Sequence, residues 1–255
     1  MDSDDIIYGR NTVREAVKSG RSIDKVIIAE GTTDGSIKEI EGLARDRKIV
    51  VIKKDKRYLD EICMPFGRNN ITANHQGVAA FVSALEYAEV EDIISAAQDK
   101  DSSLIILLDG VTDINNVGAI IRSAECLGAD GIIMAKRRSA PLNSAANKAS
   151  CGALEYVKVA RVSNISQALD KLKQAGYWTA AAVMDGQDVL KTDLSGKIAL
   201  VIGDEGEGIS PLVSKNCDYK VSIELMGKIE SLNASAAAAV LMFEKRRQDK
   251  TKNLT

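Results

Sequence analysis

The chain has 255 residues, of which 45% are hydrophobic, 4% aromatic and 27% charged, with a formal net charge of −2. This length predicts one large or two modest globular domains, and no apolar run approaches the roughly 20 residues that a membrane-spanning helix needs. A polycationic nucleic-acid binder is excluded, so any nucleic-acid partner would be held by local basic patches. Without a signal sequence, the protein is expected in the cytoplasm.

The cysteines and the single histidine give no pattern typical of a metal site. Cys63, Cys126, Cys151 and Cys217 are widely separated and form no CxxC pair. This spacing argues against zinc, and the expected cytoplasmic setting argues against a disulfide framework. His75 has no second histidine or nearby cysteine, so we favour a turn residue over an RNA contact.

Three runs concentrate positive charge. They are residues 53–57, residues 136–138 and the tail from Lys245 to Lys252. Each run alone is more typical of a solvated surface than of a nucleic-acid site.

The first segment, residues 5–83, predicts a small α/β unit in which helices pack on a sheet. Asn11 or Thr12 is the candidate cap of its first helix, whose apolar positions are Val13, Ala16 and Val17. Later elements are expected as strands over 24–29, 49–52 and 78–82 and helices over 36–47 and 55–63. Residues 84–103 resemble a linker with a short helix over 90–98, and the domain boundary is expected there.

From Leu104 onward the pattern predicts a second, larger α/β domain. Strands are expected over 104–109, 131–135, 156–159, 178–183, 198–202 and 219–223. Helices are expected over 117–127, 143–149, 165–175, 211–215 and 232–247. Residues 104–108 and 198–202 are apolar at every position, which is typical of a parallel sheet covered on both faces. Ligands bind such sheets at the carboxyl ends of the strands.

The first loop at a predicted strand end runs from Asp109 to Ser123. We expect a helix to begin at Asn116. Gly118 has no side chain, so we expect a ligand or another backbone to approach the helix closely there. Arg122 follows six residues later, and we expect the helical twist to return it toward the opening end. The alternative is an arginine that serves only as a surface charge.

The second loop, Gly203 to Pro211, follows an apolar strand and places Ser210 as N-cap before Pro211. Its glycine order, GxxGxG without a following GK[ST], matches neither the dinucleotide fingerprint nor the P-loop. The carboxylates of Asp204, Glu205 and Glu207 would repel phosphates and would better tolerate a cationic ligand.

The third stretch, Met226 to Glu244, combines a polar loop with an alanine-rich helix. Ser231, Asn233 and Ser235 offer hydrogen-bonding groups where helix N–H groups are unpaired. A well-capped core helix is an equal alternative. One cleft that collects polar residues from all three loops would be more specific than any single motif. Its members would be Asn116, Arg122, Glu205, Ser231 and Asn233.

Taken in order, these segments resemble the three motifs of the SpoU (TrmH) family of RNA 2′-O-ribose methyltransferases. The matching positions are Asn116, Gly118, Ala119 and Arg122; Gly203, Glu205, Gly206 and Gly208; and Met226, Gly227, Ile229, Ser231, Leu232, Asn233 and Ser235. Residues 150–155 also resemble a family loop. The front segment from Ile7 to Val78 is similar to the family's L30e-like substrate-binding domain. Ile114 and Glu224 depart from the pattern, because the family usually has proline there.

The resemblance implies a fold and partners that no periodicity could indicate. It implies an α/β protein with an L30e-like RNA-binding domain over 1–83, a linker over 84–103, and a trefoil-knotted SPOUT methyltransferase domain over 104–255. The enzymes of the family are homodimers whose active sites borrow from both subunits. The implied reaction is S-adenosylmethionine-dependent 2′-O-methylation of a guanosine ribose in 23S rRNA, with tRNA as the alternative substrate.

The resemblance also implies roles for individual residues. The implied catalytic residues are Asn116, Arg122, Glu205, Ser231 and Asn233. The implied cofactor-binding residues are Ile202, Gly203, Glu205, Gly206, Ile223, Leu225, Met226, Ser231, Leu232 and Ser235. Arg10 and Asn11 are candidate RNA contacts, as is His75 in the alternative to its turn role. Because a free guanidinium rarely loses its proton, Arg122 is expected to clamp a phosphate and stabilise the forming alkoxide.

Two rival classes stay open. An RNA-binding ribosome-assembly protein without catalysis would keep the folds, but it would be expected to lose Asn116, Arg122 or Asn233, and all three are present. A nucleotide-dependent oxidoreductase would need GxGxxG after the strand 104–109, where no such run occurs.

Overall fold

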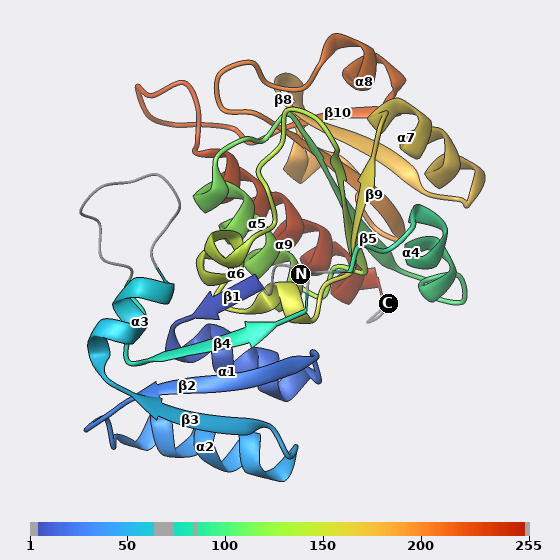
Figure 1. The fold of residues 1–255 in the computed structure, drawn as a ribbon. Helices are drawn as coiled ribbons and strands as arrows, with labels where there is room; N and C mark the ends of the chain where they lie inside the picture. Colours follow the sequence, from blue (N-terminus) through green and yellow to red (C-terminus); the bar gives the residue numbers. More distant parts are fainter. Residues whose placement is uncertain (1–4, 64–73, 84–85, 253–255) are drawn as a thin grey trace. The chain divides into compact units, whose positions relative to one another are not determined.

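The computed structural model describes residues 5–63, 74–83 and 86–252 (Figure 1). These residues form two compact units. The first unit holds the described residues up to Glu86 together with Pro141–Tyr156, and the second holds Tyr87–Ala140 and the described residues from Val157 onward. Ala84 and Leu85, where the predicted linker begins, lie outside the described residues.

The first unit is a four-stranded sheet with helices on both faces. Its strands lie in the order β1-β4-β2-β3, and only β2 and β3 are parallel. Its elements are β1 (Asp5–Tyr8), α1 (Arg10–Ser19), β2 (Ile23–Ala29), α2 (Gly35–Asp46), β3 (Val50–Lys54), α3 (Lys56–Ile62), β4 (Val78–Val82), α6 (Ser144–Ala149) and the 3₁₀ turn η1 (Ala153–Glu155).

Alternation along β2 explains how this sheet is covered on both faces. Val26 and Ile28 pack with α1 and α2, whereas Ile27 packs with Leu59 of α3 on the other face. Successive side chains of a strand point to opposite faces, so an apolar run covers both. Strand β1 was not predicted. Helix α1 also begins earlier than expected, because its N-cap is Gly9 and not Asn11 or Thr12.

Residues 141–156 pack within the first unit, although the sequence analysis placed them in the second domain. Arg21 Nη1 contacts Glu155 Oε1 at 2.8 Å in an ion pair whose side chains are only 10% and 3% exposed. Lys148 Nζ donates to the Asn74 carbonyl at 2.6 Å, and Tyr156 Oη donates to Glu15 Oε2 at 2.7 Å. These contacts explain why the strand predicted over 156–159 is wrong: Glu155 and Tyr156 are held by α1 and its neighbours, and the strand begins only at Val159.

The second unit is a six-stranded, fully parallel sheet in the order β10-β8-β9-β5-β6-β7. Its elements are α4 (Val90–Ala96), β5 (Ser103–Asp109), α5 (Ile114–Cys126), β6 (Gly131–Ala135), β7 (Val159–Val162), α7 (Ile165–Gln174), β8 (Trp178–Asp188), η2 (Val189–Lys191), β9 (Lys197–Gly203), α8 (Pro211–Asn216), β10 (Tyr219–Ser222) and α9 (Ala234–Lys252).

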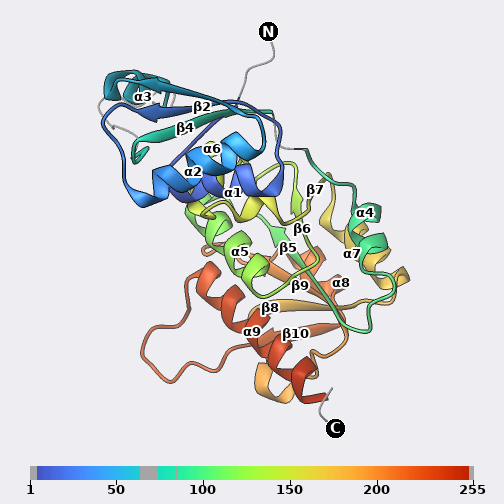
Figure 2. The same ribbon diagram turned by 90° about the horizontal axis from the view of Figure 1, so that it is seen from below.

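Both faces of this sheet are covered, as the continuous apolar strands predict. Ile105 and Leu107 of β5 pack with Ile93 of α4 and Leu169 of α7. Helices α5 and α9 pack against each other, and Figure 2 shows them on the opposite face from α4 and α7. The predicted linker helix is therefore a core element of this unit.

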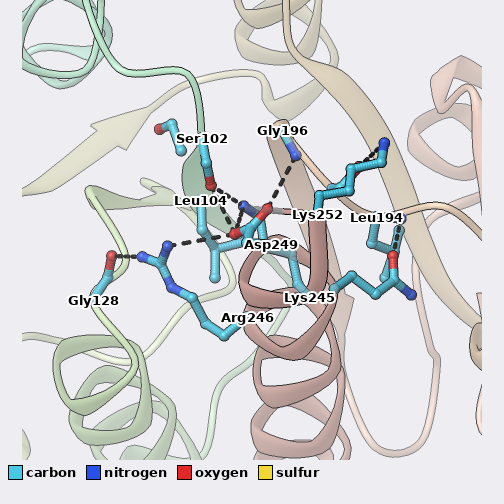
Figure 3. Close-up of polar contacts among 12 residues, drawn as sticks. Ser102, Leu104, Gly128, Leu194, Gly196, Lys245, Arg246, Asp249 and Lys252 are labelled. Atoms are coloured by element: carbon cyan, nitrogen blue, oxygen red, sulfur yellow. Dashed lines mark hydrogen bonds and ion pairs between the residues drawn. The ribbon is translucent and has the colours of Figure 1, made fainter. Parts of the chain in front are cut away.

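The C-terminal half of α9 is anchored by a buried charge network (Figure 3). Lys245 is 1% exposed, and its Nζ contacts Asp249 Oδ2 at 2.5 Å and Ser102 Oγ at 2.6 Å. Asp249 Oδ1 accepts from the Gly196 backbone N–H at 3.1 Å. Arg246 Nε donates to the Leu127 carbonyl at the end of α5 at 2.6 Å. Breaking a buried pair on one side costs about 3–5 kcal/mol, so this network fixes α9 firmly against β5 and α5.

The same contacts remove the C-terminal basic run from the nucleic-acid candidates. Lys245 and Arg246 are engaged as described above, and Arg247 makes a double hydrogen bond to Glu244 at 2.8 Å. Lys252 pairs with Asp193 at 3.0 Å. The run looks basic in the sequence but is largely neutralised within the fold.

Candidate active site

Three residues from distant parts of the second unit meet in one hydrogen-bonded hub. Asn116 Nδ2 donates to Glu205 Oε1 at 3.0 Å. Asn233 Nδ2 donates to the same oxygen and to Asn116 Oδ1 at 2.9 Å. The backbone N–H of Ala234 also donates to Glu205 Oε1, at 3.3 Å. The predicted convergence of Asn116, Glu205 and Asn233 is therefore what the fold produces.

Local capping positions the two asparagines of this hub. Asp113 caps α5 by accepting from the backbone of Asn115 and Asn116. Helix α5 therefore begins at Ile114, earlier than predicted, and Ile114 occupies the first helical position, where proline is favoured. Asn233 Oδ1 accepts from the N–H groups of Ser235 and Ala236. The Asn233 side chain therefore both caps α9 and belongs to the hub.

The loop after β9 carries Glu205 on a tight turn. Asp204 and Gly208 exchange backbone hydrogen bonds at 3.2 and 3.0 Å, which folds the turn back over the end of the strand. A Cβ on Gly203 would lie 2.3 Å from the Gly208 backbone, so only glycine allows this approach. Asp109 Oδ2 accepts from the Ser210 N–H at 2.8 Å and ties the turn to β5.

Beside the hub lies a cavity of about 430 Å³ at the carboxyl ends of β8, β9 and β10. The size falls within the usual range of small-molecule sites, about 300–1,000 Å³. Its lining comes from four chain segments: Ala182, Val183, Met184 and Asp185; Ile202, Gly203, Asp204, Glu205, Gly206, Glu207, Gly208 and Ile209; Val221, Ser222, Ile223 and Leu225; and Glu230, Ser231, Leu232, Ala234, Ala237 and Leu241.

The lining combines apolar walls with carboxylates and includes no lysine or arginine. Ile202, Leu232 and Leu241 supply apolar surface, whereas Asp185, Glu205 and other acids supply negative charge. A cationic ligand with an apolar body fits this composition, and a polyphosphate does not.

Most predicted cofactor residues line this cavity. Ile202, Gly203, Glu205, Gly206, Ile223, Leu225, Ser231 and Leu232 do so. Met226 is not in the lining, and it is 91% exposed. Ser235 is absent from the lining as well, and its hydroxyl donates to Asn233 Oδ1 at 2.5 Å.

Arg122 lies on α5 and is exposed. Six residues along a helix correspond to about 9 Å of rise and about 120° of rotation away from Asn116. The expected return of Arg122 toward the start of its own helix is therefore wrong, because six residues do not complete two turns. Asn116 is 8% exposed and faces the hub, so the two side chains leave α5 on different sides.

The predicted RNA contacts lie in the first unit and differ in accessibility. Arg10 pairs with Asp34 at 2.6 Å and donates to the Gln76 carbonyl at 3.0 Å, while Asn11 is exposed. His75 is only 3% exposed. Its Nδ1 accepts from the Gly77 N–H at 3.0 Å, and its Nε2 lies 3.1 Å from Asp60 Oδ1. This arrangement favours the turn role for His75.

The sequence missed the wall that β8 contributes, residues 182–185. The strand 178–183 was predicted, but its end has no motif, so nothing marked it as part of a site. β8 lies between β10 and β9, and this position brings its residues 182–185 to the cavity. The strand order was the missing information.

Within residues 5–63, 74–83 and 86–252, no group of three or more His, Cys, Asp or Glu side chains could hold a metal ion. Over the same ranges, no helix has the length and apolar character that crossing a membrane requires.

Comparison with protein families gives two matches that together span most of the chain. Residues 103–243 match the SpoU rRNA methylase family, and residues 6–88 match the family described as RNA 2′-O ribose methyltransferase substrate binding. A protein of Staphylococcus aureus (strain MSSA476), whose name assigns it to the TrmH family of tRNA/rRNA methyltransferases, is 40% identical over 94% of this chain and 95% of its own length. A relative from Bacillus subtilis (strain 168) is 38% identical over 94% of each chain.

Solved structures give the same picture. The SpoU methyltransferase AviRb from Streptomyces viridochromogenes, crystallised with S-adenosylmethionine, matches with a TM-score of 0.77 and 26% identity, over 95% of this chain and 89% of its own. A second structure of the same enzyme gives a TM-score of 0.80 and 25% identity, over 98% of this chain and 91% of its own.

Proposed function

The chain belongs to the SpoU rRNA methylase family, and on that premise we propose that it methylates the 2′-hydroxyl of a guanosine ribose in 23S rRNA. It is an S-adenosylmethionine-dependent RNA methyltransferase. The finer assignment, to one ribose of one RNA, is the proposal. The observation that supports methyl transfer to a ribose is the hub of Asn116, Glu205 and Asn233 beside the acidic, partly apolar cavity, and the match of residues 103–243 to an rRNA methylase family supports the choice of rRNA.

The residues present fit S-adenosylmethionine. This cofactor supplies a methyl group that its sulfonium charge already activates. Glu205 and Asp185 line the cavity and would balance that positive charge, and Leu232 and Leu241 would contact its apolar parts. The turn between Gly203 and Gly208 would present backbone N–H and C=O groups to the ligand. Eight of the ten implied cofactor residues, Glu205 among them, share this lining, which supports their assignment.

The hub would act on the ribose by positioning. A 2′-hydroxyl becomes a good nucleophile only when its proton leaves or its developing charge is stabilised. Glu205 orients both asparagine amides and would assist the departure of that proton. Asn116 would orient the ribose, and Ser231 and Asn233 would order the loop around substrate and cofactor. Alignment of the attacking oxygen with the methyl group is then mainly a matter of geometry.

Arg122 would clamp the adjacent phosphate and stabilise the forming alkoxide, as its planar, permanently charged group suits. Within one chain, Arg122 and Asn116 leave α5 in different directions. We therefore propose a homodimer in which Arg122 of the partner subunit completes each site. In a two-fold dimer the arrangement is reciprocal, so each subunit gives one arginine and receives one.

The first unit would select the RNA. The chain has few aromatic residues, so recognition would rely on shape, backbone and a few polar contacts rather than on stacking. Arg10 and Asn11, at the start of α1, are proposed as RNA contacts. The trefoil knot and the cytoplasmic location are part of this proposal as well.

The test uses the full-length protein, S-adenosylmethionine with a radiolabelled methyl group, and deproteinised 23S rRNA or bulk tRNA from bacterial cells that lack the gene. We expect label in 23S rRNA, at one guanosine whose 3′-phosphodiester bond becomes resistant to alkali. Label in tRNA alone would overturn the rRNA assignment in favour of tRNA. Label on a base, or no label in either RNA, would overturn the proposed ribose methylation.

A further inference from the structure

We propose that the loop after β6, with Lys136, Arg137 and Arg138, binds the phosphate backbone of the substrate RNA next to the methylated nucleotide. These three residues are called the basic loop below. This inference rests on the proposed function, because it assigns the RNA path across the second unit. It commits to RNA phosphates as the ligand.

The basic loop is a run of exposed cations in the unit that holds the hub of Asn116, Glu205 and Asn233. All three side chains are exposed, and among the described residues none of them takes part in an ion pair. In the C-terminal run, Lys245 is buried against Asp249. In residues 53–57, Lys53 pairs with Glu41 at 3.1 Å. Lys54, Lys56 and Arg57 of that run are exposed as well, but they belong to the first unit and not to the unit that holds the hub. Exposed lysine and arginine side chains without carboxylate partners are available to bind phosphate groups.

A fourth cation supports the loop from the neighbouring strand. Arg161 of β7 donates through Nη2 to the Lys136 carbonyl at 2.9 Å. Its guanidinium carbon lies 5.4 Å from the centre of the Tyr87 ring, and its Nε is buried without a hydrogen-bond partner. Arg161 thus holds the base of the loop and adds positive charge that no carboxylate of the described residues offsets by an ion pair.

The basic loop adjoins the candidate active site. The backbone N–H of Ala140, two residues after the basic loop, donates to the Val111 carbonyl at 3.1 Å. Val111 belongs to the segment between β5 and α5, which leads directly to Asn116. β6 pairs with β5 in the sheet, so the start of the basic loop and the end of β5 are about one strand spacing, roughly 5 Å, apart.

The charges along this edge of the sheet are segregated. The strands run in the order β10-β8-β9-β5-β6-β7. The acids that line the cavity lie within β8 or follow β9 and β10, whereas the basic loop and Arg161 lie at β6 and β7. Asn116 follows β5, between the two groups. A cationic methyl donor on the acidic side and a polyanionic RNA on the basic side would meet at Asn116.

The experiment compares two double variants that each remove two exposed positive charges. Arg137→Gln/Arg138→Gln alters the basic loop. Lys158→Gln/Lys250→Gln is the matched control, because both lysines are exposed and lie before β7 and near the end of α9. Binding of deproteinised 23S rRNA is measured by filter retention between about 50 and 200 mM KCl, since each lost phosphate contact lowers the salt slope by about 0.7–0.9.

We expect the basic-loop variant to lower the salt slope by about 1–2 and to raise the KM for RNA roughly tenfold. Its affinity for S-adenosylmethionine and its turnover at saturating RNA should match wild type, and the control should match wild type throughout. An unchanged slope and KM, or an equal loss in the control, would overturn the proposal. A wild-type protein that methylates no RNA would instead overturn the proposed function, and the binding measurement would still report on the basic loop.

Discussion

Asn233 and Asn116 lie 117 positions apart in the chain, yet the Asn233 amide donates to the Asn116 side-chain oxygen at 2.9 Å. Both amides also donate to one oxygen of Glu205. The orientation of each amide is therefore fixed by the others, and Glu205 is the acceptor on which the whole arrangement depends.

Replacing Glu205 by glutamine should weaken cofactor binding strongly. The amide oxygen can still accept, but the negative charge is lost, and a hydrogen bond to a charged group contributes about 1.5–3 kcal/mol. We expect the affinity for S-adenosylmethionine to fall about tenfold to a hundredfold in calorimetry. Glu125→Gln removes the same charge from an exposed position on α5 and should bind as wild type. Equal affinities for Glu205→Gln and wild type would contradict this role.

Gly203→Ala should damage the turn that presents Glu205. The added methyl group would lie 2.3 Å from the Gly208 backbone, so the turn must move. We expect a loss of about 1–3 kcal/mol in the free energy of unfolding, with weaker cofactor binding. Gly42→Ala adds the same group on α2, where nothing lies within 4 Å, and should stabilise by about 0.5–1 kcal/mol. The free energy of unfolding of both variants is measured by urea denaturation. A Gly203→Ala protein as stable as wild type would contradict the predicted steric clash.

Acid stability should depend on Asp130. Burial alone would raise the pKa of this carboxyl, but hydrogen bonds from Lys100, Ser103 and the Leu104 N–H outweigh it, so the pKa lies below its ordinary value. A depressed pKa stabilises the fold above the ordinary value, about 4 for aspartate, and this contribution disappears as the pH falls through the folded pKa.

The free energy of unfolding, measured by urea from pH 6 to pH 3, should therefore fall less steeply in Asp130→Asn than in wild type. Asp24→Asn, at a side chain that is 66% exposed, should keep the wild-type profile. Parallel profiles for wild type and Asp130→Asn would show that Asp130 makes no such contribution.

Mixed dimers test whether Arg122 acts across the subunit boundary. Arg122→Ala and Glu205→Ala proteins should each transfer almost no methyl groups. When they are unfolded and refolded together, each heterodimer would contain one site with both native residues. Random mixing should then restore roughly a quarter of wild-type activity. A mixture as inactive as its components would contradict the shared site, and Arg122→Lys, if fully active, would contradict the planar clamp.

The sequence predicted the parts of the site that polar motifs mark. Asn116, Glu205 and Asn233 stand in loops rich in glycine and small polar residues, and their convergence at strand ends followed from a parallel sheet. The wall from Ala182 to Asp185, in the middle of β8, was not predictable, because the apolar residues 182–184 look the same in the sequence whether or not they face a ligand. Its neighbours are set by the strand order, which no local pattern encodes.

The sequence also could not predict which basic side chains are buried. Lys245, Arg246 and Arg247 have the same composition as the basic loop. Lys245 is 1% exposed beside Asp249, however, whereas Arg137 is exposed. The difference arises from tertiary packing of α9 against Ser102 and Leu127, which lie more than a hundred positions earlier in the chain. The return of residues 141–156 to the first unit escaped prediction for the same reason.

The most direct test of the proposed cofactor site is a calorimetric titration of the full-length protein with S-adenosylmethionine, in wild type and two variants of α9. Ala237 lines the cavity, so Ala237→Phe should fill it and abolish the binding heat. Ala236 is exposed and outside the lining, so Ala236→Phe should bind as wild type. Binding to Ala237→Phe with wild-type affinity, or no binding to wild type, would contradict the assignment of this cavity to the methyl donor.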